Sequence, residues 1–189
     1  MLQGRAPEGI LDTYESERIA FARKLVRTTD QIFTFATAEG RLADILRTRI
    51  APLIIPAAAR VDALREWVFR TLSQLMIHYR GSPLSEGKAG EVHGGDRLPW
   101  VKGADNFGPL AVPSWQVHVY GSAPAELLAA CGSQNLPLHV FDWCEAHAAA
   151  GFSRNAMYLI RPDTYVALAA GTSSPQALES YFKDRRLRP

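Results

Sequence analysis

The chain has 189 residues, 47% hydrophobic and 21% charged, which is typical of one packed globular domain or two small ones and excludes a disordered segment. Its 21 Lys and Arg residues and 19 Asp and Glu residues leave a net charge of +2, too small for a general nucleic-acid-binding surface. No apolar run reaches the ~20 residues of a membrane span, because Pro52 and Pro56 interrupt the longest one, residues 50–59.

The two cysteines, Cys131 and Cys144, are too few for a disulfide framework. The chain also opens without the charged and apolar pattern of a secretory leader. We therefore expect two buried thiols and a cytoplasmic protein that binds neither membrane nor nucleic acid.

The first half of the chain is predicted to be helical. Apolar residues recur at every third or fourth position from Leu11 to about Phe35, the pattern of a long amphipathic helix. A second helix is predicted over 41–49, ending before Pro52 because a residue that precedes proline disfavours the helical conformation. A third helix is predicted over 58–77.

The second half alternates strands and helices. Residues 79–113 are rich in glycine and proline and show no periodicity, so we predict a long loop there. Apolar and β-branched runs then predict strands, and amphipathic runs predict helices. The predicted elements are a strand at 115–120, a helix at 124–131, a strand at 138–141, a helix at 143–150, strands at 158–160 and 165–168, and a helix at 175–185.

This order, βαβ followed by a helix and then ββα, is that of a thioredoxin-like domain. We predict an α+β fold with a helical segment at 1–80, a connector at 81–112 and a thioredoxin-like α/β domain at 113–189. Thioredoxin chemistry needs Cys-x-x-Cys at the start of the first helix of the domain, but residues 121–126 read Gly-Ser-Ala-Pro-Ala-Glu. Thiol exchange is therefore not expected.

The remaining patterns do not predict a catalytic, cofactor-binding or metal-binding residue. His139, Asp142, Cys144 and His147 are close in sequence, but a junction between a strand and a helix points such side chains in different directions, so packing and surface roles are favoured over metal binding. The glycines of 87–95 match neither a dinucleotide fingerprint nor a phosphate loop, and no serine has the context of a nucleophile.

Four parts of the sequence are more specific when taken together and in order. The first spans residues 2–18 and includes Leu11-Asp-Thr-Tyr-Glu-Ser-Glu-Arg18; the others are 73–84, Gly95-Asp-Arg-Leu-Pro99, and the hairpin at 159–168. This set resembles the flavin-dependent aromatic monooxygenases, in the phenol-hydroxylase-like or para-hydroxybenzoate-hydroxylase-type branch of the FAD hydroxylases. The resemblance covers nearly the whole chain.

The resemblance implies a parent enzyme that hydroxylates an aromatic ring with O₂, FAD and NADPH or NADH. The Gly-rich fingerprint, the Asp-Gly motif and the Gly-Asp motif that hold FAD in such enzymes do not occur in this sequence. The chain therefore resembles the C-terminal portion of a hydroxylase, namely a thioredoxin-like domain with preceding helices. Alone it is expected to be non-catalytic and to bind no cofactor.

The same resemblance suggests what such a portion would do. It would serve stability, dimerisation or shielding of the active site, with the FAD and substrate domain of the parent enzyme and a second copy of the chain as partners. A stand-alone, non-redox thioredoxin-like module that binds other proteins is the alternative.

Structural roles are also implied for several residues near the start and in the middle of the chain. Tyr14, Glu17 and Arg18 would be structural, with Glu17 and Arg18 anchoring their helix to the FAD domain. A solvated helix face explains Glu17 equally well, whereas Arg18 has the better claim to that role. Asp96 and Arg97 would fix the loop between the domains.

The hairpin carries the last group of implied structural residues. Arg161 and Asp163 would fix the hairpin, and Pro162 presets the backbone for its turn. Relatives commonly place glycine where this chain has Thr164, which predicts a turn without the positive φ that glycine permits.

Overall fold

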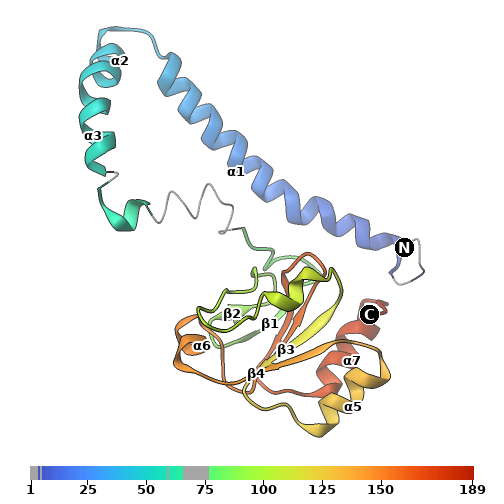
Figure 1. The fold of residues 1–189 in the computed structure, drawn as a ribbon. Coiled ribbons are helices and arrows are strands. Elements are labelled where there is room, and N and C mark those ends of the chain that lie inside the picture. Colours follow the sequence, from blue (N-terminus) through green and yellow to red (C-terminus); the bar gives the residue numbers. More distant parts are fainter. Residues whose placement is uncertain (1–3, 5, 59, 66–76) are drawn as a thin grey trace. The chain divides into compact units, whose positions relative to one another are not determined.

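The fold is seen in a computed structural model that describes residues 4, 6–58, 60–65 and 77–189 (Figure 1). The chain divides into two compact units: unit 1 consists of residues 1–17 and 78–189, and unit 2 of residues 18–77. In the described part of the chain, no helix is long and apolar enough to cross a membrane.

Helices make up unit 2. Helix α1, Asp12–Thr37, begins in unit 1 and continues into unit 2, which confirms the first predicted helix. It is followed by α2 (Arg41–Ile45), a π-helical turn η2 (Leu46–Ile50) and α3 (Ala51–Ala58). Most of the third predicted helix, at 58–77, lies outside the described residues, although residues 62–65 are helical.

The prediction that the second helix stops before Pro52 is wrong. The helical path continues through Pro52 to Ala58, with Pro56 inside α3. The five residues of η2 come directly before α3, and a π turn is wider than an α turn. Pro52 is the second residue of α3, in the first helical turn, where the missing N–H of proline is tolerated.

A six-stranded mixed sheet forms the centre of unit 1, with strand order β2-β1-β6-β5-β3-β4. Pairs β3/β4 and β1/β6 are parallel, whereas the other neighbours are antiparallel. The strands are β1 (Glu86–Ala89), β2 (Val92–His93), β3 (Gln116–Tyr120), β4 (Leu138–Phe141), β5 (Met157–Ile160) and β6 (Val166–Ala170).

The predicted βαβ and ββα elements are confirmed. Strands β3 and β4 are joined by α5 (Ala125–Ser133), α6 (Glu145–Ala149) precedes the β5–β6 hairpin, and α7 (Pro175–Asp184) follows it. Short 3₁₀ helices occupy Glu8–Leu11 (η1) and Gly108–Ala111 (η3). The fold class is therefore α+β, with N-terminal helices before a thioredoxin-like sheet that lacks Cys-x-x-Cys.

The prediction of a structureless loop at 79–113 is wrong, because β1 and β2 lie within it and extend the sheet. The glycines that indicated a loop instead allow close backbone contact. A Cβ atom on Gly87 would lie 2.3 Å from the carbonyl oxygen of Ala169, and one on Gly94 would lie 2.3 Å from the backbone nitrogen of Glu86. Glycine content here marks tight strand pairing.

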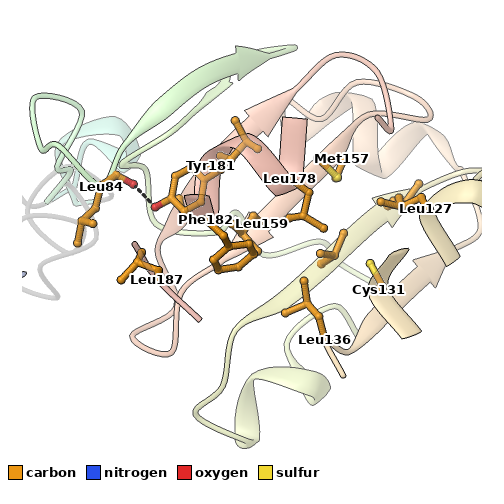
Figure 2. Close-up of a cluster of buried hydrophobic side chains, with 14 residues drawn as sticks. Leu84, Leu127, Cys131, Leu136, Met157, Leu159, Leu178, Tyr181, Phe182 and Leu187 are labelled. Atoms are coloured by element: carbon orange, nitrogen blue, oxygen red, sulfur yellow. Dashed lines mark hydrogen bonds between the residues drawn. The ribbon is translucent and has the colours of Figure 1, made fainter. Parts of the chain in front are cut away.

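Two apolar cores cover the two faces of this sheet. Met157 and Leu159 of β5 belong to one cluster and Tyr158 and Ile160 to the other, because alternate side chains of a strand point to opposite faces. Figure 2 shows the first cluster, in which side chains of α5 and α7 cover the same face. Both clusters lie entirely in unit 1.

The last helix, α7, packs on this core. Leu178, Tyr181 and Phe182 of α7 are buried. The hydroxyl of Tyr181 donates a hydrogen bond of 2.8 Å to the carbonyl of Leu84, so α7 also holds the segment that leads into β1 (Figure 2).

Candidate functional site

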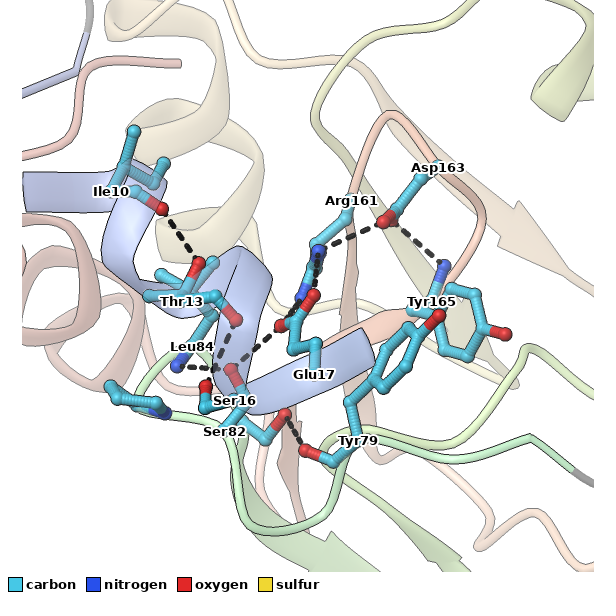
Figure 3. Close-up of polar contacts among 12 residues, drawn as sticks. Ile10, Thr13, Ser16, Glu17, Tyr79, Ser82, Leu84, Arg161, Asp163 and Tyr165 are labelled. Carbon is cyan, nitrogen blue, oxygen red and sulfur yellow. Dashed lines mark hydrogen bonds and ion pairs between the residues drawn. The ribbon is translucent and has the colours of Figure 1, made fainter. Parts of the chain in front are cut away.

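Three segments that are far apart in sequence meet at one polar cluster of unit 1 (Figure 3). They are the start of α1, the turn at 79–85 and the β5–β6 hairpin. We call this cluster the Glu17 site and define it as Glu17, Ser82, Arg161 and Asp163. It contains three of the residues that the family resemblance nominated.

The carboxylate of Glu17 is the acceptor at the centre of the site. Arg161 donates to it from both ends of the guanidinium group, from Nη1 to Oε1 at 2.6 Å and from Nη2 to Oε2 at 3.1 Å. Ser82 donates from Oγ to Oε1 at 2.7 Å. Only 11% of the Arg161 side chain and 7% of the Glu17 side chain are exposed, so this pair is shielded from solvent.

The position of Ser82 fixes the direction in which its hydroxyl donates. Its Oγ accepts a hydrogen bond of 3.1 Å from the backbone N–H of Leu84, so the hydroxyl hydrogen is available for Glu17. The backbone N–H of Ser82 donates to the carbonyl of Tyr79 at 2.8 Å, which closes the turn. The turn therefore presents a hydrogen-bond donor to Glu17.

The guanidinium of Arg161 is held from other sides as well. Nη2 donates to Oδ2 of Asp163 at 2.8 Å, and the group lies 6.0 Å from the ring centroid of Tyr79. Burial acts to lower the pKa of Arg161, but its hydrogen bond to Glu17 and the charges of Asp163 and Glu17 outweigh it, so the pKa is raised. Arg161 is thus a fixed positive charge.

These contacts exclude one of the two explanations offered for Glu17. The solvated helix face is wrong, since Glu17 is buried and its carboxylate is paired within unit 1. Anchoring of α1 to a separate FAD domain by Glu17 or Arg18 stays a prediction. Arg18 and Tyr14 are exposed, with 66% of Tyr14 accessible, and the structural roles predicted for them also stay predictions.

The turn of the hairpin differs from its prediction at one residue. Arg161 and Tyr165 close a three-residue loop, since the Arg161 N–H donates to the Tyr165 carbonyl at 2.8 Å. Pro162 and Asp163 are exposed at its tip, and Thr164 has a φ of 73°. The prediction of a turn without positive φ is therefore wrong, because a loop of this length ends on a left-handed residue whatever the side chain.

Asp96 and Arg97 join their segment to the same hairpin. The carboxylate of Asp96 accepts hydrogen bonds of 2.6 and 3.0 Å from the guanidinium of Arg80, and its backbone carbonyl accepts one of 2.8 Å from Val166. Arg97 forms an isolated β-bridge with Tyr165. The role predicted for Asp96 and Arg97, fixing the loop between the domains, stays a prediction.

The potential metal ligands near β4 do not converge. Among the described residues, no group of three or more His, Cys, Asp or Glu side chains is placed to hold a metal ion. His147 instead caps α6, where its Nδ1 accepts from the backbone N–H of Cys144 at 3.1 Å. Cys144 is exposed, so the expectation of two buried thiols is wrong for it, whereas Cys131 is buried and burial raises its pKa.

Sequence reasoning missed a buried polar row on β3. His118 lies between Gln116 and Tyr120, with Nε2 3.1 Å from Gln116 Oε1 and Nδ1 3.3 Å from the Tyr120 hydroxyl, and Asn106 donates to that hydroxyl at 3.2 Å. Burial, with a smaller effect from His139, lowers the pKa of His118 to about 3. Alternation of polar and apolar residues in β3 suggests a half-exposed strand, yet all five residues are buried.

The described clusters include one thiol beside an imidazole, with Sγ of Cys144 3.2 Å from Nδ1 of His147. The Glu17 site combines a fixed cation, a hydroxyl donor and two carboxylates. This donor set recognises a carboxylate. In this chain the site joins Glu17 to the turn at 79–85 and to the hairpin.

No family model and no curated protein matches this chain. Solved structures do match its fold. The OxyS anhydrotetracycline hydroxylase from Streptomyces rimosus matches 100% of this chain and 37% of its own, with a TM-score of 0.64 and 20% identity. CabE, an aromatic hydroxylase from angucycline biosynthesis, matches 99% of this chain and 37% of its own, with a TM-score of 0.63 and 24% identity.

A third structure is the rebeccamycin biosynthetic enzyme RebC with reduced flavin. It matches 97% of this chain and 37% of its own, with a TM-score of 0.59 and 20% identity. The chain thus spans little more than a third of the length of these enzymes, consistent with their C-terminal portion. It shares their fold over that length.

Proposed function

We propose that this chain is the C-terminal part of a flavin-dependent aromatic hydroxylase and that it acts by stabilising, dimerising or shielding the catalytic part. The observation that carries the proposal is the extent of the fold match. It runs over 97–100% of this chain in three hydroxylases but over only 37% of each of them. The order of the four sequence segments supports the same assignment.

Residues of unit 2 would provide the contact with the FAD and substrate domain. The apolar side chains of α1 have large exposed fractions, 53% for Leu25, 64% for Ile32 and 66% for Phe33. No residue of unit 2 whose exposure the structure describes is buried. Burial against a partner domain would remove this apolar surface from water, which is the main source of free energy for such association.

The described residues of this chain do not fit FAD themselves. The turn between β3 and α5 is where a dinucleotide would lie in a βαβ unit, but Asn155 occupies it. Oδ1 of Asn155 accepts from the backbone N–H of Ser122 at 2.9 Å, and a Cβ atom on Gly121 would lie 2.2 Å from the same oxygen. The proposed parent enzyme would hold FAD and NADPH or NADH in its other domains, in the cytoplasm.

The proposal is tested by expressing the chain with and without the reading frame upstream of its gene. We expect that frame to encode a Gly-rich dinucleotide fingerprint, and the joined protein to purify with bound FAD and to consume O₂ and NADPH or NADH with an aromatic compound. The chain alone should bind no FAD. An upstream region without such a frame, or one FAD bound per isolated chain, would contradict the proposal.

Unit 1 also favours a second candidate, a stand-alone thioredoxin-like module that binds other proteins. Both apolar cores lie in unit 1, so this unit has the core of an independent domain. Size-exclusion chromatography with light scattering separates the candidates when the hydroxylase domain is supplied in trans. A hydroxylase tail should form a complex with that domain, whereas a stand-alone module should stay monomeric and should not bind it.

A further inference from the structure

We propose that Ser82 and Arg161 form a receptor for a carboxylate, which Glu17 fills in this chain, and that this receptor holds residues 6–17 on the rest of unit 1. When the Glu17 carboxylate is removed, the same receptor binds a small free carboxylate such as formate. This proposal is independent of the function proposed above.

The receptor is preorganised by contacts that do not involve Glu17. Asp163 and the ring of Tyr79 hold the guanidinium of Arg161, and the backbone N–H of Leu84 orients the hydroxyl of Ser82. A donor that is already fixed loses little side-chain freedom when an acceptor binds. The receptor should therefore keep its geometry without its natural occupant.

The donor geometry selects a carboxylate over a spherical anion. Two N–H groups of Arg161 meet the two oxygens of Glu17 side by side, at 2.6 and 3.1 Å, and the Ser82 hydroxyl adds a third bond at 2.7 Å. A planar fork of this kind matches a planar two-oxygen acceptor. A chloride ion cannot satisfy all three donors at those positions.

The segment that carries Glu17 has a second, apolar point of attachment. Ala6 and Ile10 are partly buried and pack against the first core cluster of unit 1. Thr13 donates to the carbonyl of Ile10 at 2.7 Å, which holds the short helix η1 to the start of α1 (Figure 3). The segment is thus attached at both ends, by apolar contact near Ile10 and by the charged pair at Glu17.

Removing the Glu17 carboxylate should leave Arg161 buried beside only one acidic partner, Asp163. A buried charge that loses a partner is strongly destabilised, so an added anion of the right shape gains affinity for it. Formate and acetate are small enough to replace the end of the Glu17 side chain, and they carry its chemistry.

The test uses the full-length chain with Glu17→Ala and hydrogen exchange read by mass spectrometry. We expect amide exchange in residues 8–17 to rise about tenfold or more, while amides of β3 and β5 keep their protection. Formate at high concentration should reverse most of this rise, and chloride at the same ionic strength should not. Equal effects of formate and chloride, or unchanged exchange in the variant, would overturn the proposal.

Two further variants keep the test decisive if Glu17→Ala does not fold. Glu17→Gln keeps the shape but loses the charge, and Ser82→Ala removes one donor only, so each should raise exchange in residues 8–17 by a smaller factor. Glu91→Ala is the matched control, because Glu91 pairs with Lys88 at 3.4 Å and 82% of its side chain is exposed. An equal rise in the Glu91 variant would show that the effect is not specific to the receptor.

Discussion

Unit 1 and unit 2 differ in how much of their apolar side chains is exposed. Unit 1 buries its apolar residues in two clusters, one on each face of a sheet, with Leu159 and Leu178 fully buried. In unit 2 many apolar residues are exposed, among them Leu42 at 84% and Leu53 at 74%. A unit with its own core can fold alone, whereas amphipathic helices with open faces gain most of their stability from a partner.

The largest expected effect contrasts a leucine of each unit. Leu159→Ala should lower the free energy of unfolding by about 2–5 kcal/mol, since it removes buried methyl groups and leaves a cavity. Leu42→Ala should change it by less than about 0.5 kcal/mol because that side chain is exposed. Urea unfolding of both variants measures this contrast, and equal losses would mean that unit 2 shares the core.

The second prediction concerns pH and the buried row on β3. His118 has a pKa lowered to about 3 in the folded chain, against about 6.5 when unfolded, so the unfolded chain binds more protons between these values. This histidine contributes stability that is complete above pH 6.5 and is lost as the pH falls towards 3. Between these pH values, His118 should raise the free energy of unfolding by up to about 1.4 kcal/mol per pH unit.

The measurement compares urea unfolding of the native chain and His118→Gln from pH 7 to pH 4. Carboxylates give both proteins a common acid slope, so the difference between the two slopes isolates His118. The variant should lose stability more slowly as the pH falls. Parallel curves would contradict a neutral, buried His118.

A smaller effect tests whether β1 is an integral strand of unit 1. The hydroxyl of Tyr158 accepts from the backbone N–H of Ser153 at 2.8 Å and donates to the carbonyl of Ala89 at 3.0 Å. Tyr158→Phe leaves both buried groups without this partner and should cost about 1–3 kcal/mol. Hydrogen exchange should rise in β1, with the amides of β4 as an internal control. Unchanged exchange in β1 would contradict a role of the Tyr158 hydroxyl in holding this strand.

The smallest expected effect is a gain of stability at the hairpin turn. Thr164 is β-branched and has a φ of 73°, a conformation that glycine adopts without steric cost. Thr164→Gly should therefore stabilise unit 1 by up to about 1 kcal/mol. Thr172→Gly, at an exposed residue without positive φ, should not raise the melting temperature, and a gain in both variants would argue against relief of strain at Thr164.

Local periodicity was enough to predict the long first helix and the elements of the thioredoxin-like sheet. It failed where long-range packing decides the local structure. Gly87 lies in a strand, although glycine is typical of loops. The reason for glycine there is the close approach of Ala169, which is distant in sequence and leaves no room for a side chain. Pro52 predicts the end of a helix from local sequence, although the helical path continues from η2 into α3.

In the candidate site too, single residues could be predicted from the sequence, but their contacts could not. Family resemblance nominated Glu17, Arg161 and Asp163, but the sequence separation of 144 residues between Glu17 and Arg161 hides their contact. Ser82 lies in one of the four segments that carry the resemblance, but serine beside proline is common in turns and predicts no partner for it. The spatial site could therefore be predicted in its parts but not as a unit.

The parallel pairing of β1 with β6 has a consequence for how the chain is made. Glu86 pairs with Leu168 and Gly87 with Ala169, and these partners belong to the last strand before α7. A ribosome releases residues in order, so β1 lacks this neighbour until β6 has also been synthesised. The pairing of β1 is therefore a long-range step of folding, which β1 and β2 cannot complete before residues 166–170 are available.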